Sequence, residues 1–303
     1  MLDLHRLRLL RELSIRGTVQ AVATALGYSP SAISQQLSKL QREVGAPLLE
    51  RDGRRVRLTP QARILVGHTE AVLARLEQAE AEVAAAQEEV TGSLRLATFQ
   101  SAGFALVPTM LATLAVRHPG LHIEVSVREP SHAIPGLTSR EFDLVLDEAY
   151  PGTSRPRDDR LERQPLLLDR LRLVVPTDWG RPTDVRALAE RPWAAEPSGT
   201  PAREWKVAYC RDLGFEPAVR FAFDDLPLRL RFVETGHAAA LLPDLAIRHP
   251  LAYAHVLPLP GEPAREISTV VRSTTAQHPA ITAVRAALWE AAEDLSPPIV
   301  QEE

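Results

Sequence analysis

Residues 29–44 read SPSAISQQLSKLQREV, and this run has the pattern of a single amphipathic helix. Ser29 is a favourable N-cap and Pro30 suits the first helical position, so we expect the helix to begin at Pro30. At 100° per residue one face is apolar and holds Ile33, Leu37, Leu40 and Val44. The opposite face carries small hydroxyl groups, an amide and cations but no carboxylate, and it holds Ser31, Ser34, Gln35, Ser38, Lys39 and Arg42.

This carboxylate-free face indicates DNA binding. A helix face that is merely solvated usually mixes acidic with basic side chains. Small polar side chains allow a helix to enter the major groove, where Gln35 can read adenine through two hydrogen bonds. Serine and lysine side chains on the same face can reach base edges and phosphates.

Two shorter helices are expected before this one. The first is predicted by a buried stripe with a spacing of three, which holds Leu4, Leu7, Leu10 and Leu13. Gly17 ends it, and Thr18 can cap a second helix over residues 19–26 that is followed by a turn at Gly27. A helix, a tight turn and a second helix with an exposed polar face form the helix-turn-helix arrangement.

A basic hairpin is expected at residues 48–58. The dipeptide Asp52-Gly53 between two runs that carry apolar residues is a strong hairpin signal. Four arginines crowd this segment: Arg51, Arg54, Arg55 and Arg57. A basic hairpin beside a recognition helix forms a wing that binds phosphates or the minor groove. A solubilising basic loop is the alternative.

Charge is distributed unevenly along the 303 residues. Residues 1–60 hold ten Arg or Lys against five acidic residues, a surplus of five positive charges, while the whole chain carries -4. A basic head on an acidic body suggests that only the head meets a polyanion. Early arginines interrupt the first apolar run and no stretch is long enough to cross a bilayer, so we expect a cytoplasmic protein. The single cysteine, Cys210, excludes a disulfide within these residues.

A long polar helix is expected over residues 59–91. Thr59 caps it, Pro60 occupies its first position, and Gly92 ends it. A loose apolar seam runs along it and holds Ile64, Val72, Leu76, Ala79, Val83 and Ala86. A helix this long with one narrow seam is too polar for a core helix and suits pairing with a second copy. A single helix that bridges solvent is the alternative.

The sequence resembles the LysR-type transcriptional regulators. The resemblance is carried by residues 17–40, by residues 43–51 and by Arg57-Leu58-Thr59-Pro60, without a gap over about sixty residues. One departure is visible, because the family usually has Gln-Pro after the capping serine and this chain has Pro30-Ser31. The DNA contacts that the resemblance and the helix pattern imply are Thr18, Ser29, Ser31, Ser34, Gln35, Ser38, Lys39, Arg42, Arg51, Arg54, Arg55 and Arg57.

The resemblance also implies partners. A bacterial regulator of this kind binds double-stranded operator DNA and forms a homodimer through its linker helix, here residues 59–91. It is not an enzyme and has no membrane partner. A homotetramer and a contact with RNA polymerase are left open.

Residues 93–295 alternate strand-like apolar runs with helical stretches, which predicts a parallel sheet covered by helices on both faces. Two such series resemble the two lobes of the periplasmic-binding-protein-like (type 2) effector domain of the family. We therefore expect a multidomain chain with a winged helix-turn-helix domain over 1–58, a linker helix over 59–91 and an α/β effector domain over 92–303. Lobe 1 would comprise about 93–165 and 268–295, and lobe 2 about 166–267.

Ligands of open α/β sheets bind beyond the carboxyl ends of the strands. Ser101 is the first candidate, because it begins a predicted helix and matches the effector-contacting Ser or Thr of the family, seven residues before Pro108. A plain N-cap is the alternative. The full candidate set for effector binding is Thr98, Gln100, Ser101, Glu129, Ser131, Asp147, Ser198, Thr200 and Asp224.

Five acidic residues fall at or beside these strand ends: Glu129, Asp147, Glu148, Asp224 and Asp225. They suggest an effector with both an anionic end and a cationic group, such as an amino acid. Solvated loop carboxylates are the alternative. No cofactor is expected beside this effector, whose identity the sequence does not give.

Three other functions are alternatives to an effector-dependent regulator. An enzyme on the same fold would need a placed nucleophile, a metal set or a cofactor loop, and the nine histidines show no ligand spacing. A transport-type solute receptor would not carry residues 1–91. A constitutive DNA-binding protein with a vestigial effector half stays open on the sequence alone.

Overall fold

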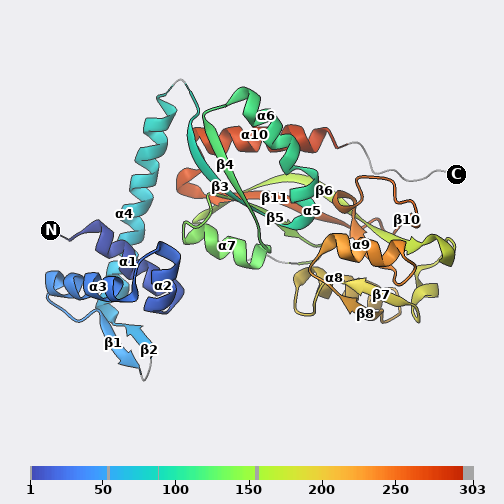
Figure 1. Ribbon diagram of the computed structural model, residues 1–303, viewed down its shortest axis with the longest axis horizontal. Coiled ribbons are helices and arrows are strands. Elements are labelled where there is room, and N and C mark those ends of the chain that lie inside the picture. Colours follow the sequence, from blue (N-terminus) through green and yellow to red (C-terminus); the bar gives the residue numbers. More distant parts are fainter. Residues whose placement is uncertain (1, 53–54, 88, 154–156, 296–303) are drawn as a thin grey trace. The chain divides into compact units, whose positions relative to one another are not determined.

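The computed structural model describes residues 2–52, 55–87, 89–153 and 157–295. Contacts divide the chain into two compact units, Met1–Ala86 and Gln87–Glu303. Each unit has its own hydrophobic core and is described by itself (Figure 1).

Three helices open the first unit: α1 (Leu4–Arg16), α2 (Val19–Leu26) and α3 (Pro30–Val44). These bounds confirm the helices expected from the sequence. The Thr18 and Ser29 hydroxyl groups accept hydrogen bonds from the first turns of α2 and α3, as N-caps do. Each helix ends at a glycine in the left-handed region, namely Gly17, Gly27 and Gly45.

The apolar face of α3 builds the core of this unit. Ile33, Leu37 and Leu40 are buried against leucines of α1 and against Val22 of α2. Strands β1 (Leu49–Asp52) and β2 (Arg55–Leu58) pair antiparallel, which confirms the hairpin, while its connecting residues 53–54 lie outside the described residues. The core therefore fixes which side of α3 faces outward.

Helix α4 (Pro60–Ala85) begins where the sequence predicts, with Thr59 as its N-cap, but ends six residues before Thr91. The prediction that it runs to 91 was wrong. Carboxylates at 88 and 89 would lie against the negative end of the helix dipole, and Val90 and Thr91 favour extended backbone. Gly92 then begins a strand and has a φ of 105°. In the described parts of the chain, no helix is both long and apolar enough to cross a membrane.

Lobe 1 of the second unit contains the parallel strands β3 (Gly92–Thr98), β4 (Leu121–Val127) and β5 (Leu144–Ala149). Alternate residues of the sheet supply two cores. On one face Leu94, Leu96 and Leu144 pack with α6 (Val107–Arg117) and α10 (Pro279–Glu293). On the other face Ala97 and Val145 pack with α7 (Pro130–Thr138), as Figure 1 shows.

The sheet is mixed: β3, β4 and β5 are parallel to one another as expected, but the other strands run antiparallel to their neighbours, which the sequence did not predict. Strand β11 (Ala264–Arg272) runs antiparallel to β5 and to the 16-residue β6 (Leu161–Pro176). Seven strands take the order β10-β6-β11-β5-β3-β4, where β10 is Ala254–Pro258, and β9 (Ala240–Pro243) pairs with β6 outside this path. The lobe boundary expected at about residue 165 falls inside β6, which contains Pro165. The proline is tolerated beside a bulge in the β6–β11 pairing.

The helix expected to begin at Ser101 is the short α5 (Gln100–Ala105), and a second helix, α6, follows it. Pro108 lies in the first turn of α6. Inside one continuous helix its ring would clash with the carbonyl group of Phe104, so the chain turns at Leu106.

Lobe 2 is built around the far half of β6. Its elements are β7 (Pro192–Ala195), α8 (Pro201–Asp212), β8 (Ala218–Ala222), α9 (Leu226–Glu234), β9 (Ala240–Pro243) and β10 (Ala254–Pro258). Leu173 and Val175 pack with α8, whereas Val174 packs with α9. Because β6 and β11 continue from one lobe toward the other, the lobes share two strands at their junction.

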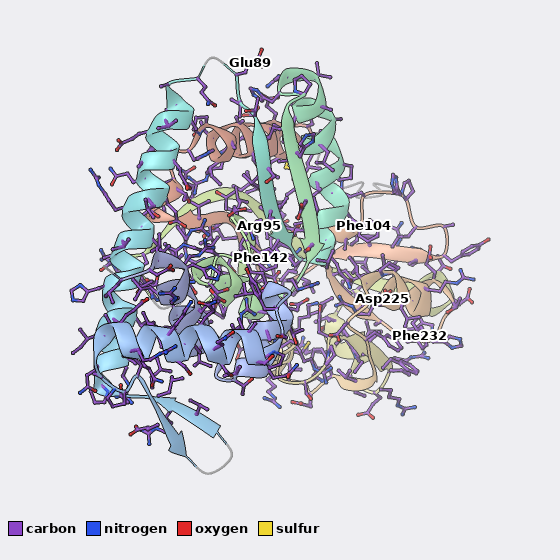
Figure 2. All side chains as sticks on the ribbon, turned by 60° about the vertical axis from the view of Figure 1, so that its left-hand side comes forward. Glu89, Arg95, Phe104, Phe142, Asp225 and Phe232 are labelled. Atoms are coloured by element: carbon purple, nitrogen blue, oxygen red, sulfur yellow. The ribbon has the colours of Figure 1, made fainter. Side chains whose placement is uncertain are left out.

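Gly136 provides a test of packing in lobe 1. A Cβ atom added there would lie 2.7 Å and 2.8 Å from two ring atoms of Phe142, which is buried and labelled in Figure 2. We expect Gly136→Ala to lower the free energy of unfolding by about 1–3 kcal/mol, because the ring must move in a packed core. Urea unfolding would measure it. Gly67→Ala in α4 is the control, since nothing lies within 4 Å of its added Cβ; equal effects of the two changes would contradict this packing.

Candidate functional site

The outer face of α3 is free to contact a partner. Ser34, Gln35 and Lys39 are exposed, as are Ser31, Ser38 and Arg42. Among the described residues no partner is seen for the side chains of Gln35, Lys39 and Arg42. The face carries no carboxylate. The nearest acid on the helix, Glu43, pairs with Arg6 of α1.

The hydroxyl groups predicted for DNA contact have local roles as well. Thr18 and Ser29 are exposed but already cap α2 and α3. The Ser38 hydroxyl donates to the carbonyl oxygen of Ser34 at 2.8 Å, and the Ser31 hydroxyl lies 2.9 Å from that of Ser29. Among the described residues, the side chains of this face for which no hydrogen bond or ion pair is seen are therefore Ser34, Gln35, Lys39 and Arg42.

The predicted wing lies partly outside the described residues. Arg57 lies on β2 with an exposed side chain. Arg51 and Arg55 lie in the paired strands, but their side chains, like the whole of Arg54, lie outside the described residues.

Gln41 of α3, which the sequence did not single out, positions the wing relative to α3. The Gln41 side-chain oxygen accepts hydrogen bonds from the backbone N–H groups of Leu48 and Leu49 at 2.9 Å and 3.1 Å. It therefore fixes where β1 leaves the helix. A glutamine just before the apolar start of a hairpin gives no pattern that distinguishes it from a solvated side chain.

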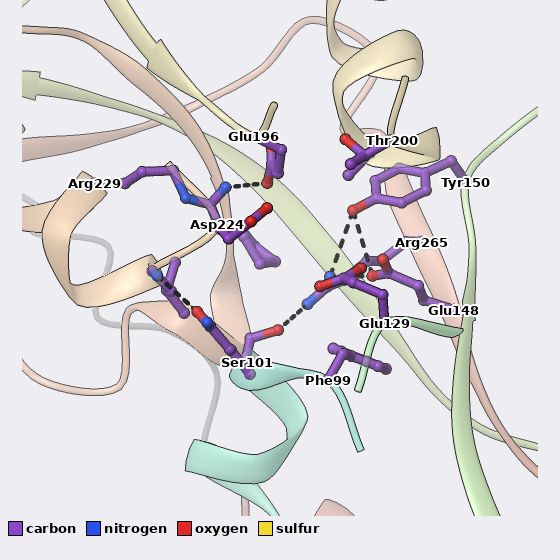
Figure 3. Close-up of a pocket in the computed structure, with 14 residues that line it drawn as sticks. Phe99, Ser101, Glu129, Glu148, Tyr150, Glu196, Thr200, Asp224, Arg229 and Arg265 are labelled. Atoms are coloured by element: carbon purple, nitrogen blue, oxygen red, sulfur yellow. Dashed lines mark hydrogen bonds and ion pairs between the residues drawn. The ribbon is translucent and has the colours of Figure 1, made fainter. Parts of the chain in front are cut away.

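A pocket of the second unit lies between its two lobes, at the carboxyl ends of β3, β4 and β8 (Figure 3). It encloses about 490 Å³ of space outside the atoms, including its open mouth. Lobe 1 supplies Phe99, Gln100, Ser101, Glu129, Glu148 and Tyr150, and lobe 2 with the crossing strands supplies Glu196, Thr200, Ala202, Asp224, Leu226, Arg229, Pro243 and Arg265.

Five predicted effector contacts line this pocket: Gln100, Ser101, Glu129, Thr200 and Asp224. Ser101 is buried, and its hydroxyl oxygen accepts a hydrogen bond from Arg265 at 2.6 Å. The Gln100 side-chain oxygen accepts from the backbone N–H of Leu226 at 2.6 Å, which links the lobes. Thr200 caps α8.

Four predicted contacts lie outside the pocket lining: Thr98, Ser131, Asp147 and Ser198. Asp147 alternates with Glu148 along β5, so its carboxylate points to the other side and pairs with Arg163. Thr98 is fully buried and donates to the carbonyl oxygen of Phe99 at 3.1 Å. Ser131 and Ser198 are exposed beyond the pocket rim. Asp225, one of the five acidic residues noted at the strand ends, is the N-cap of α9.

Arg265, which the sequence did not single out, is the best-connected group of the pocket. Its guanidinium donates to Asp169 at 2.7 Å and 2.9 Å and also pairs with Glu148. Burial alone would lower its pKa, but Asp169 and Glu148 hold that pKa well above the ordinary value. Arg265 is therefore a permanent cation whose charge is already balanced.

A second buried ion cluster lies on the lobe 2 side. Glu196 pairs with Arg229 of α9 and accepts from the Lys206 ammonium of α8 at 2.6 Å. Although burial raises the pKa of Glu196, these two cations lower it to about 2. Glu196 is therefore ionised, and its partners too are committed to an internal pair.

Comparisons with known proteins match both the region that contains α3 and the region that contains the pocket. Residues 4–63 match the model of the bacterial regulatory helix-turn-helix protein of the lysR family, and residues 87–293 match the LysR substrate binding domain. The chain belongs to the LysR family. As a LysR-type regulator it combines a DNA-binding domain with an effector-binding domain of two α/β lobes.

Relatives and solved structures span nearly the whole regulator. A probable hydrogen peroxide-inducible genes activator of Streptomyces viridosporus is 28% identical over 92% of this chain and 91% of its own. Full-length OxyR from Pseudomonas aeruginosa has the same fold, with a TM-score of 0.68 at 18% identity over 98% of this chain and all of its own. CbnR solved with its target DNA gives a TM-score of 0.53 at 19% identity, over 96% and 99%.

Helix periodicity could have identified two cations of this LysR-type regulator, Arg229 in the pocket lining and Lys206 behind it. Arg229 shares the buried face of α9 with Leu226 and Val233, and Lys206 shares that of α8 with Ala202 and Cys210. A lone cation on an apolar stripe needs a buried acid. Arg265 has no comparable signal, because its partner Asp169 is 96 residues away in sequence.

Glu129 is an acid of the pocket lining for whose side chain no partner is seen among the described residues. The pKa of its carboxyl lies above the ordinary 4.5, because the pocket desolvates it and Glu148, Glu196 and Asp224 repel its charge more than Arg229 attracts it. Ionising Glu129 therefore costs the folded regulator free energy.

This repulsion predicts a pH-dependent gain from Glu129→Gln. Because the folded pKa is raised, the unfolded state releases the proton first, and stability falls as pH rises from about 4.5 through the folded value. At pH 7 the variant should unfold at a higher temperature than the wild type, and below pH 4.5 the difference should vanish. Thermal melts over this pH range would measure it, with Glu124→Gln on β4 as an exposed control of equal charge change. A destabilised variant at pH 7 would contradict the assigned repulsion.

Proposed function

We propose that this LysR-type regulator binds operator DNA with α3 in the major groove and the β1–β2 hairpin against the adjacent backbone. The observation that carries the proposal is the outer face of α3, which is exposed and free of carboxylates while its apolar face builds the core. Gln35 would read a base, and Lys39 and Arg42 would contact bases or phosphates. CbnR, which shares the fold, is described as complexed with its target DNA.

The second part of the proposal is a homodimer formed along α4. Four large apolar side chains of the predicted seam are exposed in the single chain: Ile64 by 62%, Val72 by 46%, Leu76 by 43% and Val83 by 65%. Covering such a row against a second copy removes apolar area from water. Two recognition helices would then meet half-sites about one DNA turn apart. The tetramer, the contact with RNA polymerase and the cytoplasmic location stay predictions.

The third part assigns the pocket between the lobes to the effector. Its lining comes from both lobes, so a bound molecule stabilises one arrangement of the lobes over others. DNA binding changes only as far as the effector prefers one arrangement of the dimer. Regulation without an effector is less well supported, because charged groups are buried around an open pocket at a cost that a vestigial domain has no reason to keep.

Peroxide sensing through a cysteine is not part of this proposal, although one relative is described as a probable hydrogen peroxide-inducible activator. Cys210 is buried on α8, and burial raises the pKa of its thiol to about 12. The reactive form of cysteine is the thiolate, which is scarce at neutral pH for such a group.

Paired variants of the DNA-binding unit would test base reading. Gln35→Ala should weaken binding to the specific operator by about 1–3 kcal/mol and leave nonspecific binding unchanged, because a base contact is lost. Arg57→Ala should weaken binding to all sequences alike and reduce the salt slope by about one, because a phosphate contact is lost. Titrations of operator and scrambled duplex at several salt concentrations separate the two. An unchanged footprint for Gln35→Ala would contradict the orientation of α3.

Charge on the seam should prevent dimer formation. We expect Val72→Glu to shift the chain from dimer to monomer, because a carboxylate would be buried in an apolar interface, and to weaken DNA binding accordingly. Gln78→Glu, also exposed on α4, adds the same charge away from the seam and should leave the dimer intact. Sedimentation velocity gives the mass. Two dimeric variants would move the interface away from this seam.

A further inference from the structure

The effector pocket has more negative charge than its own cations balance. Its lining holds four carboxylates and two guanidinium groups, and the ion pairs behind them add one charge of each sign, Lys206 and Asp169. Arg265 pairs with Asp169 and Glu148, while Arg229 and Lys206 both pair with Glu196, so the charges of these six groups sum to zero. Two negative charges are therefore left over at the pocket, on side chains of exposed residues.

The surplus lies on two identified side chains. Within the described ranges no hydrogen bond or ion pair is seen for the side chains of Glu129 and Asp224, and Figure 3 shows both beside the pocket centre. Glu129 follows β4 in lobe 1, and Asp224 follows β8 in lobe 2. The two free carboxylates thus face the pocket from opposite lobes.

Unmet hydrogen-bonding capacity in the same pocket is an independent observation. The Oε2 atom of Glu196 and the Nε atom of Arg229 are buried and lack a hydrogen-bond partner. Both residues line the pocket, and Arg229 is more than nine-tenths buried. A buried polar atom without a partner is costly: the Glu196 oxygen calls for a hydrogen-bond donor, such as a cationic group, and the Arg229 Nε–H calls for an acceptor on the same ligand.

The remaining walls suit an organic cation. Tyr150 presents an aromatic ring to the pocket, and aromatic faces attract ammonium and guanidinium groups; the Phe99 ring already lies 5.0 Å from the guanidinium carbon of Arg265. A metal ion fits less well, because no three His, Cys, Asp or Glu side chains of the described residues are grouped as a metal would need. A purely anionic ligand would be repelled by the carboxylates of Glu129 and Asp224, for which no side-chain partner is seen among the described residues.

We propose that the effector of this regulator carries an ammonium or guanidinium group, which binds between Glu129 of lobe 1 and Asp224 of lobe 2. The inference rests on the proposed function, because it takes the pocket between the lobes as the effector site. The cation replaces the repulsion of two carboxylates by two attractions and so draws the lobes together. This gives the ligand a preference for the closed arrangement, which regulation requires.

The pKa of Glu129 adds a signature. Desolvation and the carboxylates of Glu148, Glu196 and Asp224 raise it, and Arg229 opposes them. A bound cation favours the ionised form and lowers this pKa. Cation binding therefore releases protons at mildly acidic pH and tightens as pH rises through the Glu129 titration.

Calorimetric titration of the full chain would test the proposal. The cation probes are 1,4-diaminobutane, L-lysine and L-arginine; succinate and magnesium chloride are the other probes. At least one cation probe should bind. Glu129→Gln and Asp224→Asn should each raise its dissociation constant by about tenfold, since each removes one charge-assisted hydrogen bond. Glu124→Gln, exposed on β4 and absent from the pocket lining, should leave it unchanged.

The outcomes separate this inference from the proposed function. Silence of all three cation probes, binding of succinate or magnesium alone, or equal effects of Glu124→Gln and Glu129→Gln would overturn the cation site. If operator binding and its response to succinate persisted in that case, the regulator function would stand. If the full chain bound no DNA while cations still bound, the proposed function would fail and the cation site would remain.

Discussion

A buried positive charge has to be balanced where it lies, and Arg265 imposes that constraint on the effector unit. Its side chain is only 4% exposed, and its partners come from β5, β6 and the start of α5. Without Asp169 and Glu148 the guanidinium group would be unpaired away from water, which costs several kcal/mol. The strands that cross between the lobes are therefore held in one register beside the pocket, and Ser101 is positioned by the same cation.

The same constraint explains why the polar part of the pocket was only half predictable. Strand ends can be read from alternation, and they led to Gln100, Ser101, Glu129, Thr200 and Asp224. Which of two adjacent acids faces the ligand depends on strand register, so Asp147 was chosen where Glu148 lines the pocket. Partners such as Asp169 and Arg265 are far apart in sequence, and no local pattern joins them.

The DNA-binding unit was more predictable, because its determinants are local. Caps at Thr18 and Ser29, glycines at helix ends and the spacing of Ile33, Leu37 and Leu40 fix three helices and the exposed face of α3. Where the local signals conflicted the prediction failed. Gly92 suggested a helix end, but the acidic segment before it had already ended α4 at Ala85. The antiparallel course of β11 was missed for another reason, since strand direction is a matter of topology and not of composition.

Balanced ion pairs and unbalanced acids have different roles in this pocket. A pair such as Arg265 with Asp169 fixes structure, and its charges contribute little attraction to a ligand because they already cancel. An unpaired acid such as Glu129 does the reverse, because it destabilises the empty pocket and so reserves free energy for a complementary ligand. Sites of function commonly keep such a local cost, which a better-packed surface would have removed. When the two unpaired acids lie on different lobes, the reserved free energy is released only as the lobes approach a shared ligand. Binding and closure are then one event, and the sign of the ligand charge decides whether closure occurs.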